Sequence, residues 1–405
     1  MSDFSSFFLM TPDDVQRYAV EVLHRFDPDE PTCCTEIGDG NINYVFRVWS
    51  EADGHSLVVK QADRLLRSSG RLLDQNRSRI EAAILRLETE LAPGFVPEVY
   101  HYDEVMAATA MEDVSDYKNL RRELMAGRFY PHLAENISAF MADTLLPTTD
   151  LILDAEEKKR RVQFFTNPEL CKITEDLVLT EPYYDYKGRN ILTLGTEDFV
   201  REKLYHDEDL HAEVAALRLN FMNNAQALLH GDLHSGSIFI NERGIKILDP
   251  EFAFYGPMGY DIGNVIGNLF FTWANKVFTG MDEALIPSLE KCIRDVYDLT
   301  LEKLRSRYDE LVEFPLYRVH AFRDTWLDSV MADSVGYAGT EIIRRTVGDS
   351  KVAEITSVTD FDQRIPIERA LIRLGVMLIK NRTCLRCGSD ITACFRRILA
   401  DGEGK

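Results

Sequence analysis

Strand-like segments crowd into the first 114 residues of this chain, and this distribution most constrains its fold. The segments are short, rich in β-branched and aromatic residues, and bounded by turns. They lie at 33–37, 44–49, 56–60, 98–102 and 105–111. An amphipathic helix is predicted over about 76–91, because its apolar residues recur on one face. From about residue 115 onward the pattern is mainly helical, apart from a hairpin-like run at 238–248.

The sequence therefore predicts an α+β fold with two lobes. We expect a small antiparallel β-rich N-lobe over 1–114 and a large, mainly helical C-lobe over 115–405. With 405 residues, of which 45% are hydrophobic, the chain can bury a large core. A helix is expected to begin behind Thr11, because a hydroxyl N-cap precedes Pro12 and two acidic residues.

The charge of the chain limits its partners. A formal net charge of -21 repels nucleic acid and anionic membrane surfaces, so we expect neither as a partner. The sequence has no apolar run long enough to span a bilayer and no secretory signal at its N-terminus, which favours a cytoplasmic protein. An odd number of cysteines, seven, fits reduced thiols, and we interpret the lone Cys384/Cys387 pair in the same way.

Two acidic motifs follow apolar strand-like runs in the segment 228–253. His230-Gly231-Asp232 comes first, and a glycine there lets the backbone turn and present the carboxylate. An Asx-turn would explain Asp232 alone, but not a second acidic pair at the end of the next strand. Asp249 and Glu251 flank Pro250, so both carboxylates can converge on one hard cation such as Mg²⁺.

This pair of motifs fits kinase-type phosphoryl transfer, which needs a base near the acceptor hydroxyl and carboxylates for magnesium. Such enzymes commonly carry a metal-binding Asn five residues after the base. Here that position is Ser237. Glu251, in contrast, adds an acidic side chain where kinases have glycine. One metal ligand is therefore predicted to have moved from the first motif to the second.

A glycine-containing turn lies between the first two predicted strands. It reads G-x-G-x-x-N, with Gly38, Gly40 and Asn43 at the specified positions. Glycines in such a turn let backbone amides approach phosphate groups closely, although a plain hairpin turn has the same composition.

Lys60 ends the third predicted strand, where kinases place their phosphate-binding lysine, although a strand-end lysine can also simply extend to solvent. Its partner should be a glutamate on the following helix. Glu81 is the preferred candidate, with Glu88 and Glu90 as alternatives.

Three further charged segments have a structural and a functional interpretation. Asp261 is expected to N-cap a helix beginning at Ile262 and to bind the backbone of the loop that carries Asp232. Arg344 and Arg345 are adjacent on a predicted helix, where such pairs are normally solvated. The charge run in the predicted loop 147–161 is interpreted as a solvated face.

Taken together, these motifs resemble a known family. They are EIGDGNINYVFRV, the Lys60 strand, MEDV, HGDLHSGSI, LDPEFAFYGPMGYDIGN and GYAGTEIIRRTVG. The segment from about 12 to 380 resembles the 5-methylthioribose kinase family. That family belongs to the aminoglycoside-phosphotransferase and choline-kinase branch of the protein-kinase-like fold. The resemblance implies a homodimer that transfers the γ-phosphoryl group of ATP to the 1-hydroxyl of 5-methylthioribose in methionine salvage, with Mg²⁺ as cofactor.

The resemblance also assigns roles to individual residues. Asp232 would be the base at the acceptor, and Lys60 would hold the ATP phosphates. Arg344 and Arg345 would reach the substrate and the transferring phosphate. Asn43 would contact ATP, and backbone groups of Glu112 and Val114 would bind adenine. Asp249 and Glu251 would bind magnesium.

Two other functions remain open on sequence grounds. A kinase of the same fold acting on homoserine, choline or an aminoglycoside would carry most of these motifs, although adjacent arginines oppose a cationic acceptor. A pseudokinase without turnover is favoured by Ser237, and opposed by the presence of Lys60, Asp232 and Asp249.

Overall fold

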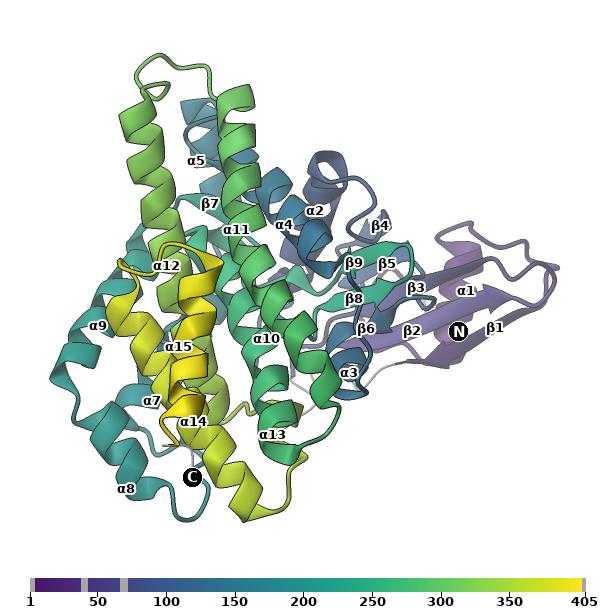
Figure 1. The fold of residues 1–405 in the computed structure, drawn as a ribbon. Helices are drawn as coiled ribbons and strands as arrows, with labels where there is room; N and C mark the ends of the chain where they lie inside the picture. Colours follow the sequence, from purple (N-terminus) through teal and green to yellow (C-terminus); the bar gives the residue numbers. More distant parts are fainter. Residues whose placement is uncertain (1–3, 38–42, 66–71, 403–405) are drawn as a thin grey trace. The chain divides into compact units, whose positions relative to one another are not determined.

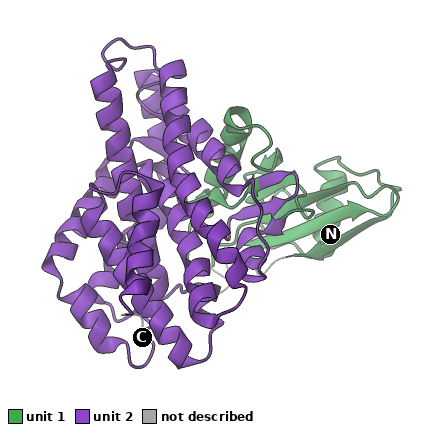
Figure 2. Cartoon of the chain, in the orientation of Figure 1, with its two compact units in different colours: residues 1–117, 246–253 green, residues 118–245, 254–405 purple. Residues whose placement is uncertain are grey.

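The computed structural model of the protein describes residues 4–37, 43–65 and 72–402. The chain divides into two compact units, coloured separately in Figure 2. The first unit comprises Met1–Tyr117 and Lys246–Ala253, and the second comprises Lys118–Ile245 and Phe254–Lys405. The short segment 246–253, which contains both Asp249 and Glu251, thus clusters with the N-terminal unit although it is distant in sequence.

The first unit is built on a five-stranded antiparallel sheet with the order β1-β2-β3-β5-β4. Its strands are β1 (Thr32–Glu36), β2 (Tyr44–Ser50), β3 (Ser56–Gln61), β4 (Val99–Asp103) and β5 (Ala108–Glu112). Because β3 lies between β2 and β5, both of its edges are hydrogen-bonded, and Lys60 is held in register opposite Val45 and Thr109. The predicted antiparallel, β-rich N-terminal part is confirmed.

Two long helices accompany this sheet. Helix α1 (Pro12–Glu21) begins at the predicted N-cap, where Thr11 and Asp14 form a capping box. Val15 and Tyr18 of α1 lie in one apolar cluster with Phe46 of β2. Helix α2 (Asn76–Leu91) has the predicted bounds.

The second unit is mainly helical, as predicted (Figure 1). Its regular α-helices are α3 (Leu120–Met125), α4 (Leu133–Leu145), α5 (Ala155–Phe164), α6 (Pro168–Leu177), α7 (Glu181–Tyr184), α8 (Glu197–Val200), α9 (Glu208–Asn223), α10 (Gly259–Thr279), α11 (Ile286–Leu311), α12 (His320–Val347), α13 (Ala353–Thr356), α14 (Phe361–Asn381) and α15 (Gly388–Ala400).

Helices α10, α12 and α14 pack against one another at the centre of this unit. Small residues let α10 and α12 approach closely. A Cβ atom on Gly263 of α10 would lie 2.5 Å from the carbonyl oxygen of Ser334 on α12, so any larger residue would push the helices apart. This contact fixes α12, which carries Arg344 and Arg345 in its last turn.

Short strands frame the loops of the second unit. Strand β7 (Ala227–Leu229) pairs antiparallel with β10 (Phe254–Gly256), and β6 (Lys118–Asn119) pairs with β8 (Ile238–Asn241). Strand β9 (Gly244–Ile247) follows β8 closely, as the predicted hairpin requires, and carries the chain into the first unit.

The charge run within 147–161 has the predicted solvated face except at Lys158, since Asp154, Glu156, Lys159 and Arg160 are exposed. It is helical from Ala155 onward, and Lys158 is buried rather than solvated. Lys158 Nζ donates to Asp150 and to the carbonyl oxygen of Gln226, so two acceptors compensate for the burial of its charge.

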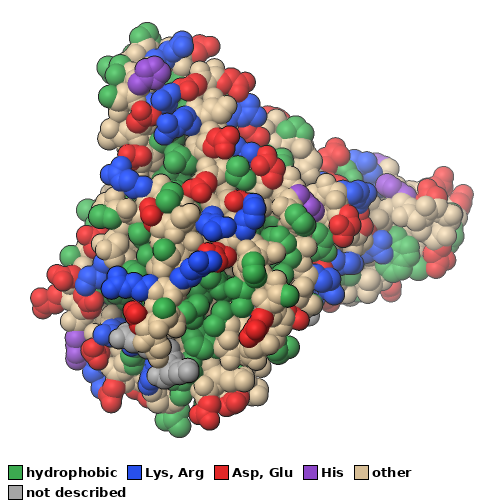
Figure 3. Space-filling model, viewed as in Figure 1, with side chains coloured by type: hydrophobic (Ala, Val, Ile, Leu, Met, Phe, Trp, Pro, Cys, Tyr) green, Lys and Arg blue, Asp and Glu red, His purple; other side chains and the backbone are tan. Residues whose placement is uncertain are grey.

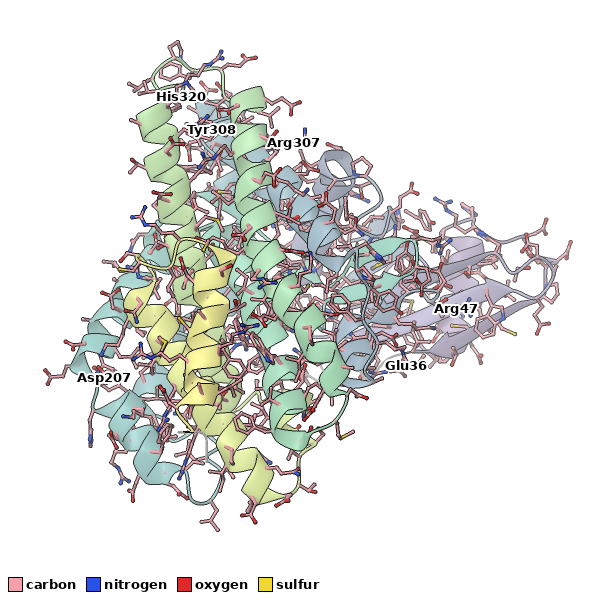
Figure 4. The ribbon with its side chains drawn as sticks, in the orientation of Figure 1. Glu36, Arg47, Asp207, Arg307, Tyr308 and His320 are labelled. Carbon is pink, nitrogen blue, oxygen red and sulfur yellow. The ribbon has the colours of Figure 1, made fainter. Side chains whose placement is uncertain are left out.

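Acidic and basic side chains are interspersed over the face of the second unit shown in Figure 3. Within the described residues, no helix combines the length and the apolar character needed to cross a membrane. Figure 4 labels Tyr308 and His320 near the connection between α11 and α12, where the Tyr308 hydroxyl donates to the carbonyl oxygen of Tyr317.

Candidate active site

Lys60 is the centre of an ionic cluster in the first unit. Its ammonium nitrogen lies 2.7 Å from Oε1 of Glu81 on α2 and 2.6 Å from Oδ1 of Asp249. Burial alone would lower the pKa of Lys60, but Asp249, Glu81 and Glu251 raise it above its ordinary value. The lysine is therefore charged, and Glu81 is the glutamate that the structure brings to it.

Asp249 follows β9 with its backbone in the left-handed region, at φ 64°. This conformation begins the 3₁₀ turn Pro250–Phe252, which places Glu251 in a buried position. Oε2 of Glu251 accepts a hydrogen bond from Nδ2 of Asn43 at 3.2 Å and lies 3.4 Å from Nε of Arg77. Nη2 of Arg77 also donates to Oδ1 of Asn43, which closes a triangle of three side chains.

The donor set of this cluster fits a hard divalent cation. The Asp249 side chain is about half exposed (53%), and Asp249 and Glu251 both offer carboxylate oxygens, the ligands that Mg²⁺ prefers. The cluster contains the carboxyl groups of Glu81, Asp249 and Glu251 but only two cationic groups, those of Lys60 and Arg77. It therefore has one more acidic than basic group. Among the described residues, no group of three or more candidate metal ligands occurs.

The residues predicted to contact adenine, Glu112 and Val114, lie at the end of β5 and just beyond it. Glu112 ends this strand, and its carboxylate accepts from Nζ of Lys246 at 2.8 Å. The Asp113 carboxylate accepts hydrogen bonds from Arg47 of β2 and from the hydroxyl of Ser56 of β3. These bonds hold the segment before Val114 against the two strands; Arg47 is labelled in Figure 4. The predicted phosphate-loop residues Gly38 and Gly40 lie outside the described residues.

In the second unit, Asp232 lies just beyond the end of β7. Gly231 has φ 82°, the left-handed conformation that the glycine was expected to provide. The Asp261 carboxylate accepts from the backbone N–H of His230 at 2.7 Å and of Gly231 at 3.0 Å. The predicted tie between Asp261 and this loop is therefore present. The predicted N-cap is wrong, because α10 begins at Gly259 and Asp261 lies within its first turn.

Three side chains surround the Asp232 carboxylate. Oδ1 lies 3.4 Å from Nη2 of Arg344 and 3.6 Å from Nη2 of Arg345, and Oδ2 lies 3.4 Å from Nε2 of His234. Burial raises the pKa of Asp232, but His234 and the two arginines outweigh it and hold the pKa well below its ordinary value. Asp232 is consequently a carboxylate at neutral pH.

The hydrogen bonds of His234 define which nitrogen of its ring carries the proton. Nδ1 accepts from the backbone N–H of Gly236 at 3.0 Å and of Ser237 at 3.1 Å. Since an accepting nitrogen has no proton in neutral imidazole, the proton lies on Nε2, which faces Asp232. His234 thus orients the carboxylate as a hydrogen-bond donor.

Arg344 and Arg345 are not a solvated pair. Their side chains are only 12% and 11% exposed, and both contact the buried Glu341. The structure therefore brings together Asp232, Arg344 and Arg345, three residues that the sequence predicts for one site.

Ser237 is buried and bound within the loop. Its hydroxyl donates to the carbonyl oxygen of Asp232 at 3.0 Å and lies 3.2 Å from Nδ1 of His234. The side chain at this position thus stabilises the Asp232 loop.

Sequence analysis missed Arg77, His234 and Glu341. Arg77 pairs with Glu251, which is distant in sequence, so its role is defined only by the fold. His234 lies two residues after Asp232, within the same motif. Glu341 left a signal, because it lies three and four residues before the two arginines, on the same helix face.

Known proteins are similar to this chain over most of its length. A model of the phosphotransferase enzyme family matches residues 34–288. A methylthioribose kinase of Geobacillus sp. (strain WCH70) is 38% identical over 378 residues, covering 92% of each chain. A methylthioribose kinase of Erwinia tasmaniensis is 37% identical over 401 residues, covering 95% of this chain and 97% of its own. Among solved structures, a choline kinase from Cryptosporidium parvum covers 90% of this chain and 96% of its own at 14% identity, with a TM-score of 0.49.

Proposed function

Since this chain belongs to the methylthioribose kinase family of phosphotransferases, we propose that it transfers the γ-phosphoryl group of ATP to the 1-hydroxyl of 5-methylthio-D-ribose. The product is 5-methylthioribose 1-phosphate, an intermediate of methionine salvage. The observation that carries this proposal is the pairing of the Asp232 carboxylate with Arg344 and Arg345. This arrangement unites an acceptor for the hydroxyl proton with cations for the transferring phosphoryl group.

Asp232 is the base of the reaction. It accepts a hydrogen bond from the 1-hydroxyl, orients that oxygen toward the phosphorus, and takes its proton as the new P–O bond forms. A low pKa suits this role, because a loose phosphoryl-transfer transition state needs the nucleophile to be positioned more than strongly deprotonated beforehand. His234 Nε2–H holds the second carboxylate oxygen, so Oδ1 remains the oxygen directed at the arginines.

The two arginines act at the substrate side. A guanidinium group carries several N–H donors in a fixed plane and always retains its charge, so it stabilises the negative charge on phosphoryl oxygens. A cationic acceptor such as choline would be repelled by this pair.

The first-unit residues bind the nucleotide. Lys60, held by Glu81, pairs with the ATP phosphates, and Asn43 contacts the same nucleotide. Backbone groups of Glu112 and Val114 bond adenine. Asp249 and Glu251 would hold Mg²⁺, which would supply positive charge to offset the negative charge that develops during transfer.

Three broader features belong to the same proposal. The protein works in the cytoplasm, where ATP is available, and acts on a small soluble sugar. Nucleic acid and membranes are not partners, in keeping with the net charge of -21. The active form is a homodimer, as the resemblance to the family implies.

A coupled assay of ADP release tests the proposal, with 5-methylthioribose, ribose, choline and homoserine offered separately. We expect kcat/KM to be highest with methylthioribose. A higher value with choline or homoserine would assign the chain to another branch of the fold. Tight ATP binding without turnover of any acceptor would identify a pseudokinase.

A further inference from the structure

A buried carboxylate links the two arginines of the candidate site. Glu341 lies on α12, three residues before Arg344 and four before Arg345, and its side chain is fully buried. Its Oε2 accepts from Nε of Arg344 at 2.5 Å, and its Oε1 accepts from Nε of Arg345 at 3.0 Å. Each carboxylate oxygen thus binds one arginine.

This contact determines how the arginines are oriented. Both use Nε to reach Glu341, and both present Nη2 to Oδ1 of Asp232. Adjacent residues on a helix project about 100° apart, and two guanidinium groups repel each other. A shared acceptor between them offsets the repulsion and keeps both side chains on one side of the helix.

Glu341 is itself held in place by a chain of hydrogen bonds. Asn268 of α10 donates from Nδ2 to Oε1 of Glu341 at 3.0 Å, and its Oδ1 accepts from Arg121 at 2.9 Å. Arg121 in turn bonds the Ser235 hydroxyl through Nε and the Ser235 carbonyl oxygen through its backbone N–H. The chain therefore returns to the loop that carries Asp232.

We infer that Glu341 is a positioning residue for phosphoryl transfer, which acts by holding Arg344 and Arg345 with their terminal nitrogens directed at the Asp232 carboxylate. The inference rests on the proposed function. It adds a residue that touches neither the acceptor nor the phosphate and acts only through the two arginines. Its loss should therefore resemble loss of the arginines, without a direct effect on nucleotide binding.

The test compares Glu341→Gln with Glu368→Gln. Glu368, on α14, is a matched control because it is also buried and paired with two cations, Lys351 at 3.0 Å and Arg364 at 3.1 Å. In Glu341→Gln we expect kcat/KM for the sugar to fall about 10²-fold, the loss expected from a small misplacement of reacting groups, while KM for ATP stays unchanged. In Glu368→Gln only the melting temperature should fall.

Non-additivity separates positioning from general destabilisation. In an Arg344→Ala/Arg345→Ala background, Glu341→Gln should cause no further loss of kcat/KM, because the groups it positions are absent. A further full loss in that background, or equal kinetic losses in Glu341→Gln and Glu368→Gln, would overturn the inference. If Glu341→Gln does not fold, Asn268→Ala provides the same comparison, with an expected loss of roughly tenfold.

A readout without substrate distinguishes failure of this inference from failure of the proposed function. Hydrogen exchange of the Arg344 and Arg345 Nε–H groups, measured by nuclear magnetic resonance, should be slow in the wild type and faster in Glu341→Gln. Unchanged exchange contradicts the positioning role whatever the acceptor is. A wild type that prefers another acceptor contradicts the proposed function alone, and the kinetic comparison is then made with that acceptor.

Discussion

Nη2 of Arg344 lies 3.4 Å from Oδ1 of Asp232, although 112 residues separate them along the chain. The contact joins the end of α12 to the loop after β7. It places a permanent positive charge beside the carboxylate proposed to receive the acceptor hydroxyl, and this charge adds to the larger effects of His234 and Arg345 in lowering the pKa of Asp232.

Replacement of Asp232 tests its role as base. Asp232→Asn keeps the shape of the side chain but removes its charge and its basicity. We expect kcat to fall roughly 10²–10⁴-fold, the usual contribution of a positioned general base. The affinity for ATP, measured by calorimetry, should remain close to that of the wild type. Near-normal turnover in this variant would remove Asp232 from the mechanism.

The two arginines should not contribute equally. Arg344 lies closer to Asp232, whereas Nη1 of Arg345 is also engaged by the carbonyl oxygen of Ser350. Arg344→Ala is therefore expected to lose more kcat/KM for the sugar than Arg345→Ala, by about tenfold, with ATP binding spared in both. Steady-state kinetics with each substrate varied in turn checks this order. Wild-type behaviour of both variants would mean that neither arginine serves the reaction.

Glu251 is predicted to contribute to the metal site. Glu251→Gln keeps one oxygen but removes the charge that favours a hard cation. The variant should need several-fold more Mg²⁺ for half-maximal rate and should be partly rescued at high metal concentration. Direct titration of Mn²⁺ in the presence of ADP, followed by electron paramagnetic resonance, should show the same weakening without turnover. Unchanged metal dependence would leave Asp249 as the proposed protein ligand.

Glu341 should also make stability dependent on pH. Burial raises its pKa, but Arg344 and Arg345 outweigh burial and lower the pKa from 4.5 to about 2. A carboxyl group with a depressed folded pKa stabilises the protein fully above its ordinary pKa and loses that contribution as pH falls toward the folded value. The contribution is about 3 kcal/mol. Urea unfolding of wild type and Glu341→Gln should therefore differ by a constant amount above pH 4.5, and the difference should shrink below it. A difference that is the same at pH 7 and pH 3 would contradict this.

Local patterns in the sequence were enough to predict the strands and helices of the N-terminal part and the mainly helical character of the rest. The N-cap at Thr11 and the bounds of α2 follow from capping chemistry and helical periodicity, both of which act within a few residues. The start of α10 was misjudged because Asp261 is a good N-cap residue by type. Its carboxylate is instead used by the backbone of His230 and Gly231, a tertiary contact that local sequence does not encode.

The candidate site was predictable where its residues belong to recurring local motifs, and not where they meet through distant parts of the sequence. Lys60 and Glu81 could be matched because a strand end and the next helix recur in a fixed arrangement in kinase-like folds. The pairing of Arg77 with Glu251 was not predictable, because it depends on segment 246–253 clustering with the N-terminal unit. The burial of Lys158 was not predictable either, because one of its two acceptors, the carbonyl oxygen of Gln226, lies 68 residues away in the sequence.

The position of the phosphate in the product tests the central claim most directly. Wild-type protein, ATP, Mg²⁺ and 5-methylthioribose are incubated, and the product is examined by phosphorus–proton correlation spectroscopy. The account predicts a single phosphate ester whose phosphorus couples to the anomeric proton at C1. A phosphate on the 2- or 3-hydroxyl, or ADP release without any phosphorylated sugar, would contradict it.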